Sequence, residues 1–264
     1  MLSQLRPSAI YLPSMMEKSF SVGLVVLSVV VATMGAYVAI EIAQRVRATE
    51  GRRRVFWTYC GAVAMGLALW SMHFVGMLAL TLPVLIWYDA LLIFASALAA
   101  LIAGAIAFFI FNRATVNWWT LGLASVFMGS AIAGMQYIGM ASVRMNGQVL
   151  YDPTFVGASV GIAMAVSFAA LILTRKLIDA GLDKGAWLRK VAASLLLGFA
   201  VAGMHYTAVS GAQFTRGLPG WRPTVDLVLG TYQLGLVIAI ISLALLALAL
   251  FATQFERSTV ATRN

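Results

Sequence analysis

The chain contains two histidines, His73 and His205. His73 lies in the stretch 55–88, which has no Asp, Glu, Lys or Arg, and an ionisable group inside such an apolar segment is costly and points to function. Each histidine lies in a similar sequence segment, GLALWSMHFVGM from Gly66 and GFAVAGMHYTAV from Gly198. A third similar segment, GSAIAGMQYIGM from Gly129, lies between them in the sequence. Their shared pattern, G-x-A-x-x-[GS]-M-[HQ]-[FY]-x-[GA]-[MV], puts His73, Gln136 and His205 in one slot.

The residue types around this slot favour a copper site. On a helix, His73 and Met77 share a face because they are four residues apart, and Gln136 and Met140 repeat that spacing. Imidazole and thioether ligands suit copper, and sulfur favours Cu(I). Neither the thiolate of a structural zinc site nor the carboxylate of a magnesium or calcium site lies nearby. The candidate ligands are His73, His205, Met72, Met77, Met135, Met140 and Met204, and the associated motif residues are Phe74, Gln136, Tyr137 and Tyr206.

Two other interpretations of the motif remain open. Methionine fills gaps in apolar helices, and small residues allow helices to approach closely in lipid, so the pattern also fits a packing role. Alternatively, two histidines on separate helices could bind a haem iron from both sides, with the small residues making room for the porphyrin.

The elements that must position these residues are membrane-spanning helices. The sequence is 62% hydrophobic and only 10% charged, which is far from the composition of soluble domains. Its apolar runs reach the roughly 20 residues that a helix needs to cross a bilayer, and they lack the alternation of barrel strands. We predict an all-α membrane protein with seven transmembrane helices, at residues 20–40, 56–78, 90–111, 118–140, 155–174, 188–210 and 227–253.

The arrangement of the motif predicts an internal repeat. Spans two, four and six carry the three copies, and Ala32, Tyr37 and Ala39 of span one resemble Ala163, Phe168 and Ala170 of span five. A two-helix unit would thus occur three times and be followed by a lone seventh span. Because two spans restore the orientation, the three units would be parallel and related by an axis along the membrane normal.

The depth of the motif can also be predicted. Trp57, Trp119 and Trp187 are expected at the cytoplasmic interface, where aromatic residues collect. The slot residues follow about 16 to 18 positions later, which corresponds to about 24–27 Å of rise in a hydrocarbon core of ~30 Å. The three motifs would therefore form one layer near the outer surface.

Basic residues predict the orientation of the chain. Thirteen of the 18 Lys and Arg fall on one side, mainly in the segments 45–54 and 175–190, and five fall on the other. We therefore expect an extracytoplasmic segment at 1–19, a membrane domain at 20–253 and a cytoplasmic tail at 254–264. The net charge of +9 reports this topology and does not indicate a nucleic-acid partner. The first span is expected to remain as a transmembrane helix and not to be cleaved as a signal peptide, because its main charges follow the apolar stretch. Cys60 is the single cysteine, so no intramolecular disulfide is expected.

With the motif defined, the sequence resembles the MHYT family of bacterial membrane sensor domains. Residues 204–207 read MHYT, residues 72–75 read MHFV, and the YDP at 151–153 is also similar, so that the resemblance covers about residues 20 to 250. It implies a multi-pass sensor in the bacterial inner membrane. It further implies that the Met and His residues of the motif bind copper and thereby detect oxygen, carbon monoxide or nitric oxide.

The sequence departs from the family pattern in three places. Gln136 stands where the family usually has histidine, and Val209 stands where a methionine could be expected. Glutamine is a poor ligand for Cu(I), so the middle motif is expected to contribute only sulfur or to give a weaker site. Family members often continue into a cyclase or phosphodiesterase domain for cyclic di-GMP, whereas this sequence ends shortly after the last span. A stand-alone form with a partner and a fragment of a longer protein both remain open.

The leading hypothesis is a ligand-sensing membrane protein, not an enzyme. A diatomic gas or a redox change would alter the copper coordination and shift the three ligand-bearing helices against one another. The basic segments 45–54 and 175–190 would contact a cytoplasmic signalling partner or anionic lipid. The competing classes are a membrane transporter of metal or a small molecule, and a bis-histidine haem electron-transfer protein.

Overall fold

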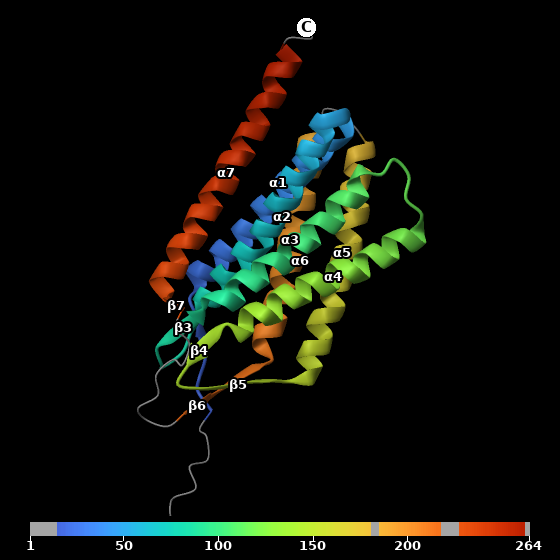
Figure 1. Cartoon of the computed structure of the whole chain (residues 1–264). Helices are drawn as coiled ribbons and strands as arrows, with labels where there is room; N and C mark the ends of the chain where they lie inside the picture. The colour runs from blue at the N-terminus through green and yellow to red at the C-terminus, as the bar shows by residue number, and fades with distance from the viewer. Residues whose placement is uncertain (1–14, 181–184, 218–226, 262–264) are drawn as a thin grey trace, which may run out of the picture.

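The computed structural model describes residues 15–180, 185–217 and 227–261, which are mostly helical (Figure 1). The helices are α1 (Val22–Ala48), α2 (Gly51–Ala79), α3 (Ala90–Asn112), α4 (Trp118–Ala141), α5 (Pro153–Asp179), α6 (Ala186–Ser210) and α7 (Thr231–Ala261). Among the described residues, α1 to α6 are long and apolar enough to cross a membrane, and α7 contributes a shorter apolar stretch, Thr231–Leu245. The prediction of a helical membrane protein with several spans is thus confirmed, and its seventh helix begins at Thr231, a few residues after the predicted start of the seventh span.

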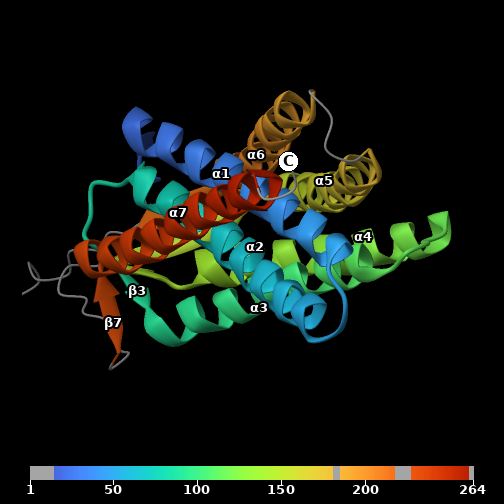
Figure 2. The same cartoon turned by 90° about the horizontal axis from the view of Figure 1, so that it is seen from above.

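The first six helices form a closed ring, in which each helix packs on the next and α6 returns to α1 (Figure 2). Helix α7 lies outside this ring against α1 and α2. Glycines allow the close approach of neighbouring helices. A Cβ atom added to Gly66, Gly129 or Gly198 would overlap with α3, α5 or α1, respectively. The first glycine of each motif copy therefore serves packing, as small residues commonly do in membrane helices.

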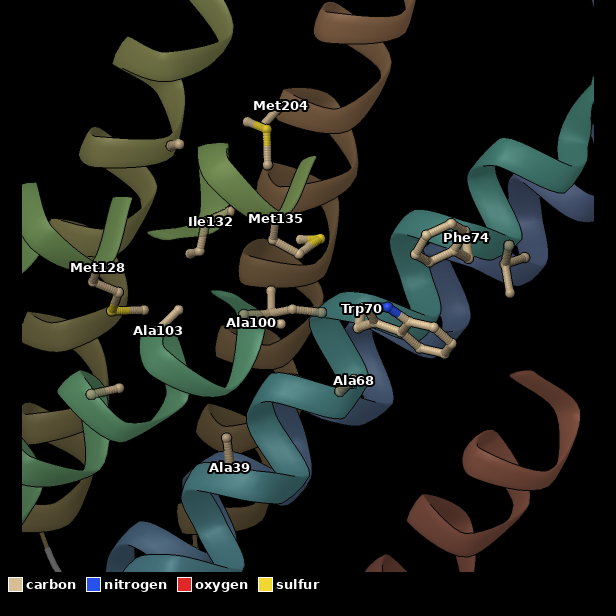
Figure 3. Packing of buried hydrophobic residues seen from close by; sticks show 14 of the residues in the cluster. Ala39, Ala68, Trp70, Phe74, Ala100, Ala103, Met128, Ile132, Met135 and Met204 are labelled. Carbon is tan, nitrogen blue, oxygen red and sulfur yellow. The ribbon is translucent and has the colours of Figure 1, made fainter. Parts of the chain in front are cut away.

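The core of the ring combines small residues with a few large ones (Figure 3). Alanines such as Ala39, Ala68 and Ala100 line the helix contacts and are almost completely buried. Beside them, Trp70 and Phe74 pack with ring centroids 4.8 Å apart, and the Trp70 indole donates to the backbone oxygen of Ile93 at 3.3 Å. The indole N–H is thus satisfied inside an apolar core.

Short strands cover one end of the ring, and we call them the strand lid. β1 (Ser19–Phe20) pairs with β2 (Leu80–Thr81), β3 (Ile86–Asp89) lies between β4 (Val143–Met145) and β7 (Val228–Gly230), and β5 (Gly147–Tyr151) pairs with β6 (Ala212–Arg216). All pairs are antiparallel. These strands were not predicted from the sequence. β1 precedes α1, and the other strands come from the segments that connect the helices.

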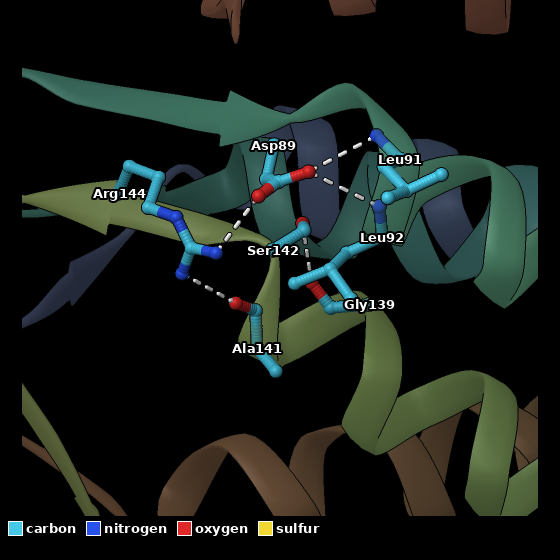
Figure 4. Close-up of polar contacts among 7 residues, drawn as sticks. All are labelled: Asp89, Leu91, Leu92, Gly139, Ala141, Ser142 and Arg144. Carbon is cyan, nitrogen blue, oxygen red and sulfur yellow. Dashed lines mark hydrogen bonds and ion pairs between the residues drawn. The ribbon is translucent and has the colours of Figure 1, made fainter. Parts of the chain in front are cut away.

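Asp89 fastens the strand lid to the helices (Figure 4). Its carboxylate accepts from the backbone N–H groups of Leu91 and Leu92 at the start of α3 and forms an ion pair of 2.8 Å with Arg144 of β4. Burial raises the pKa of this carboxyl, but the amide hydrogen bonds and the guanidinium outweigh burial and hold the net pKa below its usual value.

Lys18 makes a second connection between the lid and the ring. Its ammonium donates to the backbone oxygens of Val209, Ser210 and Ala212, at 3.1, 2.7 and 2.8 Å. A cation at a helix C-terminus is favourable because the last carbonyl groups lack partners within the helix. Lys18 therefore fixes the end of α6, the helix that carries His205.

The basic segments 45–54 and 175–190 were predicted to lie mainly between the spans, but both are partly helical. Helix α1 continues to Ala48 and α2 starts at Gly51, so that most of 45–54 is helical. In the second segment, Lys190 lies in α6 and forms a buried ion pair of 2.6 Å with Glu41 of α1. Both side chains are only 4% exposed. Of the predicted terminal segments, 1–14 and 262–264 lie outside the described residues, and 254–261 continue α7.

Candidate metal centre

The slot residues His73, Gln136 and His205 meet inside the ring, and we call them the motif triad. His73 Nδ1 lies 2.9 Å from Gln136 Oε1 and 3.2 Å from His205 Nδ1, and His205 Nδ1 lies 3.0 Å from Gln136 Oε1. The three residues come from α2, α4 and α6, and none of them exposes any surface. Three helices thus each contribute one polar atom to a single point.

The triad atoms cannot all be satisfied by hydrogen bonds among themselves. The amide oxygen of Gln136 only accepts, so that a neighbouring imidazole Nδ1 must carry a proton to bond to it. If both Nδ1 atoms are protonated, two N–H groups face each other. If only one is, a nitrogen lone pair faces the oxygen. A cation at the centre would remove this conflict, because all three atoms could then present lone pairs to it.

The size of the triad fits a metal ion. A point equidistant from the three atoms lies about 1.8 Å from each of them, close to the metal–nitrogen distances of about 2.0 Å in protein sites. Opening the triad by a few tenths of an ångström would therefore be sufficient. Among the described residues, no group of three or more His, Cys, Asp or Glu offers an alternative metal site.

The outer nitrogen of each imidazole rests against a glycine of another motif copy. His73 Nε2 faces Gly139 on α4, and His205 Nε2 faces Gly76 on α2, so that a Cβ atom at either glycine would overlap with the ring. Both Nε2 atoms are buried and have no hydrogen-bond partner. Metal-binding histidines usually donate their second nitrogen to a polar group. Here, steric fit and the Nδ1 contacts hold the rings instead.

The five candidate methionines are all buried but occupy different places. Met140 is linked to the triad because its sulfur accepts from Gln136 Nε2 at 3.3 Å, which also leaves Gln136 Oε1 facing the histidines. Met72 packs with Val31 and Ala32 of α1. The other three lie in the main core, namely Met77, Met135 and Met204.

The two histidines do not fit a haem between them. Their Nδ1 atoms are 3.2 Å apart, and their rings pack edge to face with centroids 5.1 Å apart. A porphyrin clamped by two axial imidazoles would have to lie between these rings, where the structure leaves no space. The close approach of three small polar groups suits a single ion.

The comparison with known proteins agrees with the motif. The family described as "Bacterial signalling protein N terminal repeat", MHYT, matches residues 66–124 and 129–181. The two matches begin at the first glycines of the first two motif copies. The chain belongs to the MHYT family.

The MHYT chain is also similar to curated bacterial proteins. It is 37% identical over 92% of its length to the bifunctional diguanylate cyclase/cyclic di-GMP phosphodiesterase MucR of Pseudomonas aeruginosa, of which it covers 35%. It is 27% identical to the signaling protein YkoW of Bacillus subtilis and 30% identical to the cyclic di-GMP phosphodiesterase NbdA of P. aeruginosa, and covers 30% of each. The chain thus spans about a third of these relatives. No solved structure is significantly similar to it.

The aromatic residues of the MHYT motif connect α4 and α6 to neighbouring helices. Tyr206 and Ser28 of α1 are joined by a hydrogen bond of 2.9 Å, and Tyr137 and Ser159 of α5 by one of 2.6 Å. Each serine hydroxyl also donates to a backbone oxygen of its own helix, so the tyrosine is the donor in each pair. Phe74, which has no hydroxyl, packs edge to face against His73.

The two serines were missed by sequence reasoning. Ser28 and Ser159 are 131 positions apart, the same offset that relates Ala32 to Ala163, so a comparison of the odd spans could have found them.

Proposed function

We propose that this chain is the sensory membrane region of a bacterial signalling protein and that it binds one copper ion at the motif triad. The observation that carries the proposal is the convergence of three buried polar atoms from three helices, 2.9–3.2 Å apart. Membership of a signalling family and the presence of six apolar helices support the sensory role. The proposed location is the inner membrane, with the N-terminus outside and the C-terminus in the cytoplasm.

The metal would be held by His73, His205 and Gln136. Met140 is the sulfur candidate that contacts Gln136, and the other sulfur candidates are Met72, Met77, Met135 and Met204. Bound copper would supply a centre that responds to oxygen, carbon monoxide, nitric oxide or redox state. The residues of the chain keep this centre dry, since the triad is fully buried. They also hold the imidazoles in position through Gly76 and Gly139.

The triad would act as a signal element because its members lie on different helices. A change in the spacing of its atoms would shift α2, α4 and α6 relative to one another. Tyr206 and Tyr137 would pass that shift to α1 and α5 through their serine partners. We propose that the helices act as three parallel two-helix units, which would move around one axis.

The proposed output lies outside this chain. MucR and NbdA are enzymes of cyclic di-GMP by name, and this chain matches about a third of each. We propose that the present residues catalyse no reaction and instead control a cytoplasmic signalling domain or partner.

The decisive experiment is to measure the copper content of the purified protein after Cu(I) loading, together with its visible absorption. We expect about one copper per chain and its loss in the His73→Ala/His205→Ala variant. Tyr206→Phe is the control, because it removes the hydroxyl of a motif residue but none of the proposed ligands. A folded wild type without copper would overturn the proposal, and a Soret band lost in the double variant would assign the site to haem.

A further inference from the structure

The ring contains an apolar cavity that the triad itself does not explain. Its volume is about 60 Å³, and residues from all of α1 to α6 line it. The space exists because several wall positions carry small side chains, among them Ala39, Ala68 and Ala170. Since protein interiors rarely leave voids much larger than a water molecule, a cavity of this size at the centre of the ring is a candidate binding site.

The cavity lies directly next to the motif triad. Leu69, Ile132 and Val201 belong to its wall, and each precedes a triad residue by four positions on the same helix. Residues four apart share a helix face and differ by about 6 Å in height. The cavity thus begins one helical turn from the triad, on the side away from the strand lid.

The lining selects against water and ions. Its side chains carry only carbon and sulfur apart from the hydroxyls of Ser167 and Thr174. The Ser167 hydroxyl already donates to the backbone oxygen of Ala163 at 2.7 Å. A buried water needs two to four polar partners, whereas dry apolar cavities bind xenon or small hydrocarbons. The available volume fits an uncharged molecule of two or three heavy atoms.

We propose that this cavity binds a small apolar gas molecule and holds it one helical turn from the triad. Entry from lipid is favoured at α5, which contributes Ala170 and is the least buried of the six ring helices. The link from the cavity to signalling rests on the proposed function of the triad. Binding of the gas in the cavity is independent of the function of the triad, because it depends only on apolar contacts.

Crystals of the metal-free protein under xenon pressure test the site. We expect anomalous density for xenon between Leu69, Ile132 and Val201. Ala170→Leu should remove that density by filling the cavity. Ala169→Leu is the matched control, because it makes the same change at the adjacent residue, which is exposed on α5. Absence of xenon from the wild-type cavity, or equal xenon density in both variants, would overturn the proposal.

A second measurement separates this proposal from the metal proposal. In copper-loaded protein, binding of carbon monoxide can be followed by its infrared stretch. We expect Ala170→Leu, but not Ala169→Leu, to slow this binding several-fold. Xenon in the cavity of a protein that binds no copper would uphold the cavity and overturn the function of the triad. Copper at the triad without xenon in the cavity would uphold the function of the triad and overturn the cavity proposal.

Discussion

At the scale of single residues, the imidazoles are positioned by glycines that belong to other copies of the motif. Gly139 leaves the space that His73 Nε2 occupies, and Gly76 does the same for His205. The histidine of one motif copy and the glycine of another therefore form one packing unit between two helices. This explains why both residue types recur at fixed spacing.

Gly139→Ala tests this packing unit. The added methyl group would overlap with the His73 ring, and such overpacking typically costs about 1–3 kcal/mol. We expect a lower free energy of unfolding and weaker copper binding, measured by thermal unfolding and metal titration. Gly134→Ala is the control on the same helix, because nothing lies within 4 Å of its added Cβ. Equal loss in both variants would show that helix α4 simply does not tolerate alanine.

A second prediction concerns the one position of the triad that lacks histidine. The α2 imidazole rests on the α4 glycine and the α6 imidazole on the α2 glycine, so the third pair in this cycle is Gln136 with Ala208. Both departures from the His–Gly pattern thus fall on one pair. Gln136→His should bind copper more tightly only together with Ala208→Gly, which makes room for the ring.

The four proteins of that double-mutant cycle measure the coupling between the two positions. We expect a coupling free energy of about 1–3 kcal/mol in copper affinity, as is typical for residues in contact. Additive effects would mean that Gln136 does not face Ala208 in the way His73 faces Gly139.

The slot residues themselves could be predicted from the sequence, because the motif around them occurs in three copies. Their partners could not. Which glycine faces His73, and which serine bonds to Tyr206, depends on the order of helices around the ring. That order is a tertiary property, and the residues involved are distant in the sequence.

At the scale of elements, hydropathy located the six ring helices but not all of their ends. Helix α1 was predicted to end at Ile40, where the apolar run stops, yet it continues to Ala48. The reason is Glu41, which is buried because Lys190 of α6 neutralises it inside the helix contact. Hydropathy treats each charge separately and cannot anticipate a pair that forms between α1 and α6.

The Glu41–Lys190 pair predicts an asymmetric mutational response. Glu41→Gln leaves a buried cation without its carboxylate, and breaking a buried pair in this way costs about 3–5 kcal/mol. Glu41→Leu/Lys190→Met replaces both charges by apolar groups, and we expect most of the stability to return. Denaturation of the purified proteins in detergent gives both values. A double variant as unstable as Glu41→Gln would mean that the pair has a role beyond charge neutralisation.

At the scale of the whole molecule, the two ends of the ring are chemically different. The strand lid closes the end near the triad, and the connection between α1 and α2 lies at the opposite end, next to Arg45 and Arg47. The lid was not predictable, since strands such as β7 are short and are specified by their partner β3. Residues 227–230 therefore form part of the lid instead of the start of the seventh span, where the apolar pattern had placed them.

The different ends make the orientation testable with two exposed positions. If the basic end is cytoplasmic, Thr81→Cys on β2 should react with a membrane-impermeant maleimide on intact cells, and Glu50→Cys between α1 and α2 should react only after lysis. Both are made in a Cys60→Ser background, which removes the remaining thiol. The reverse pattern would place the triad near the cytoplasm. With the expected pattern, the triad lies close to the outer surface, and its metal would arrive from outside the cytoplasm while the signal leaves at the basic end.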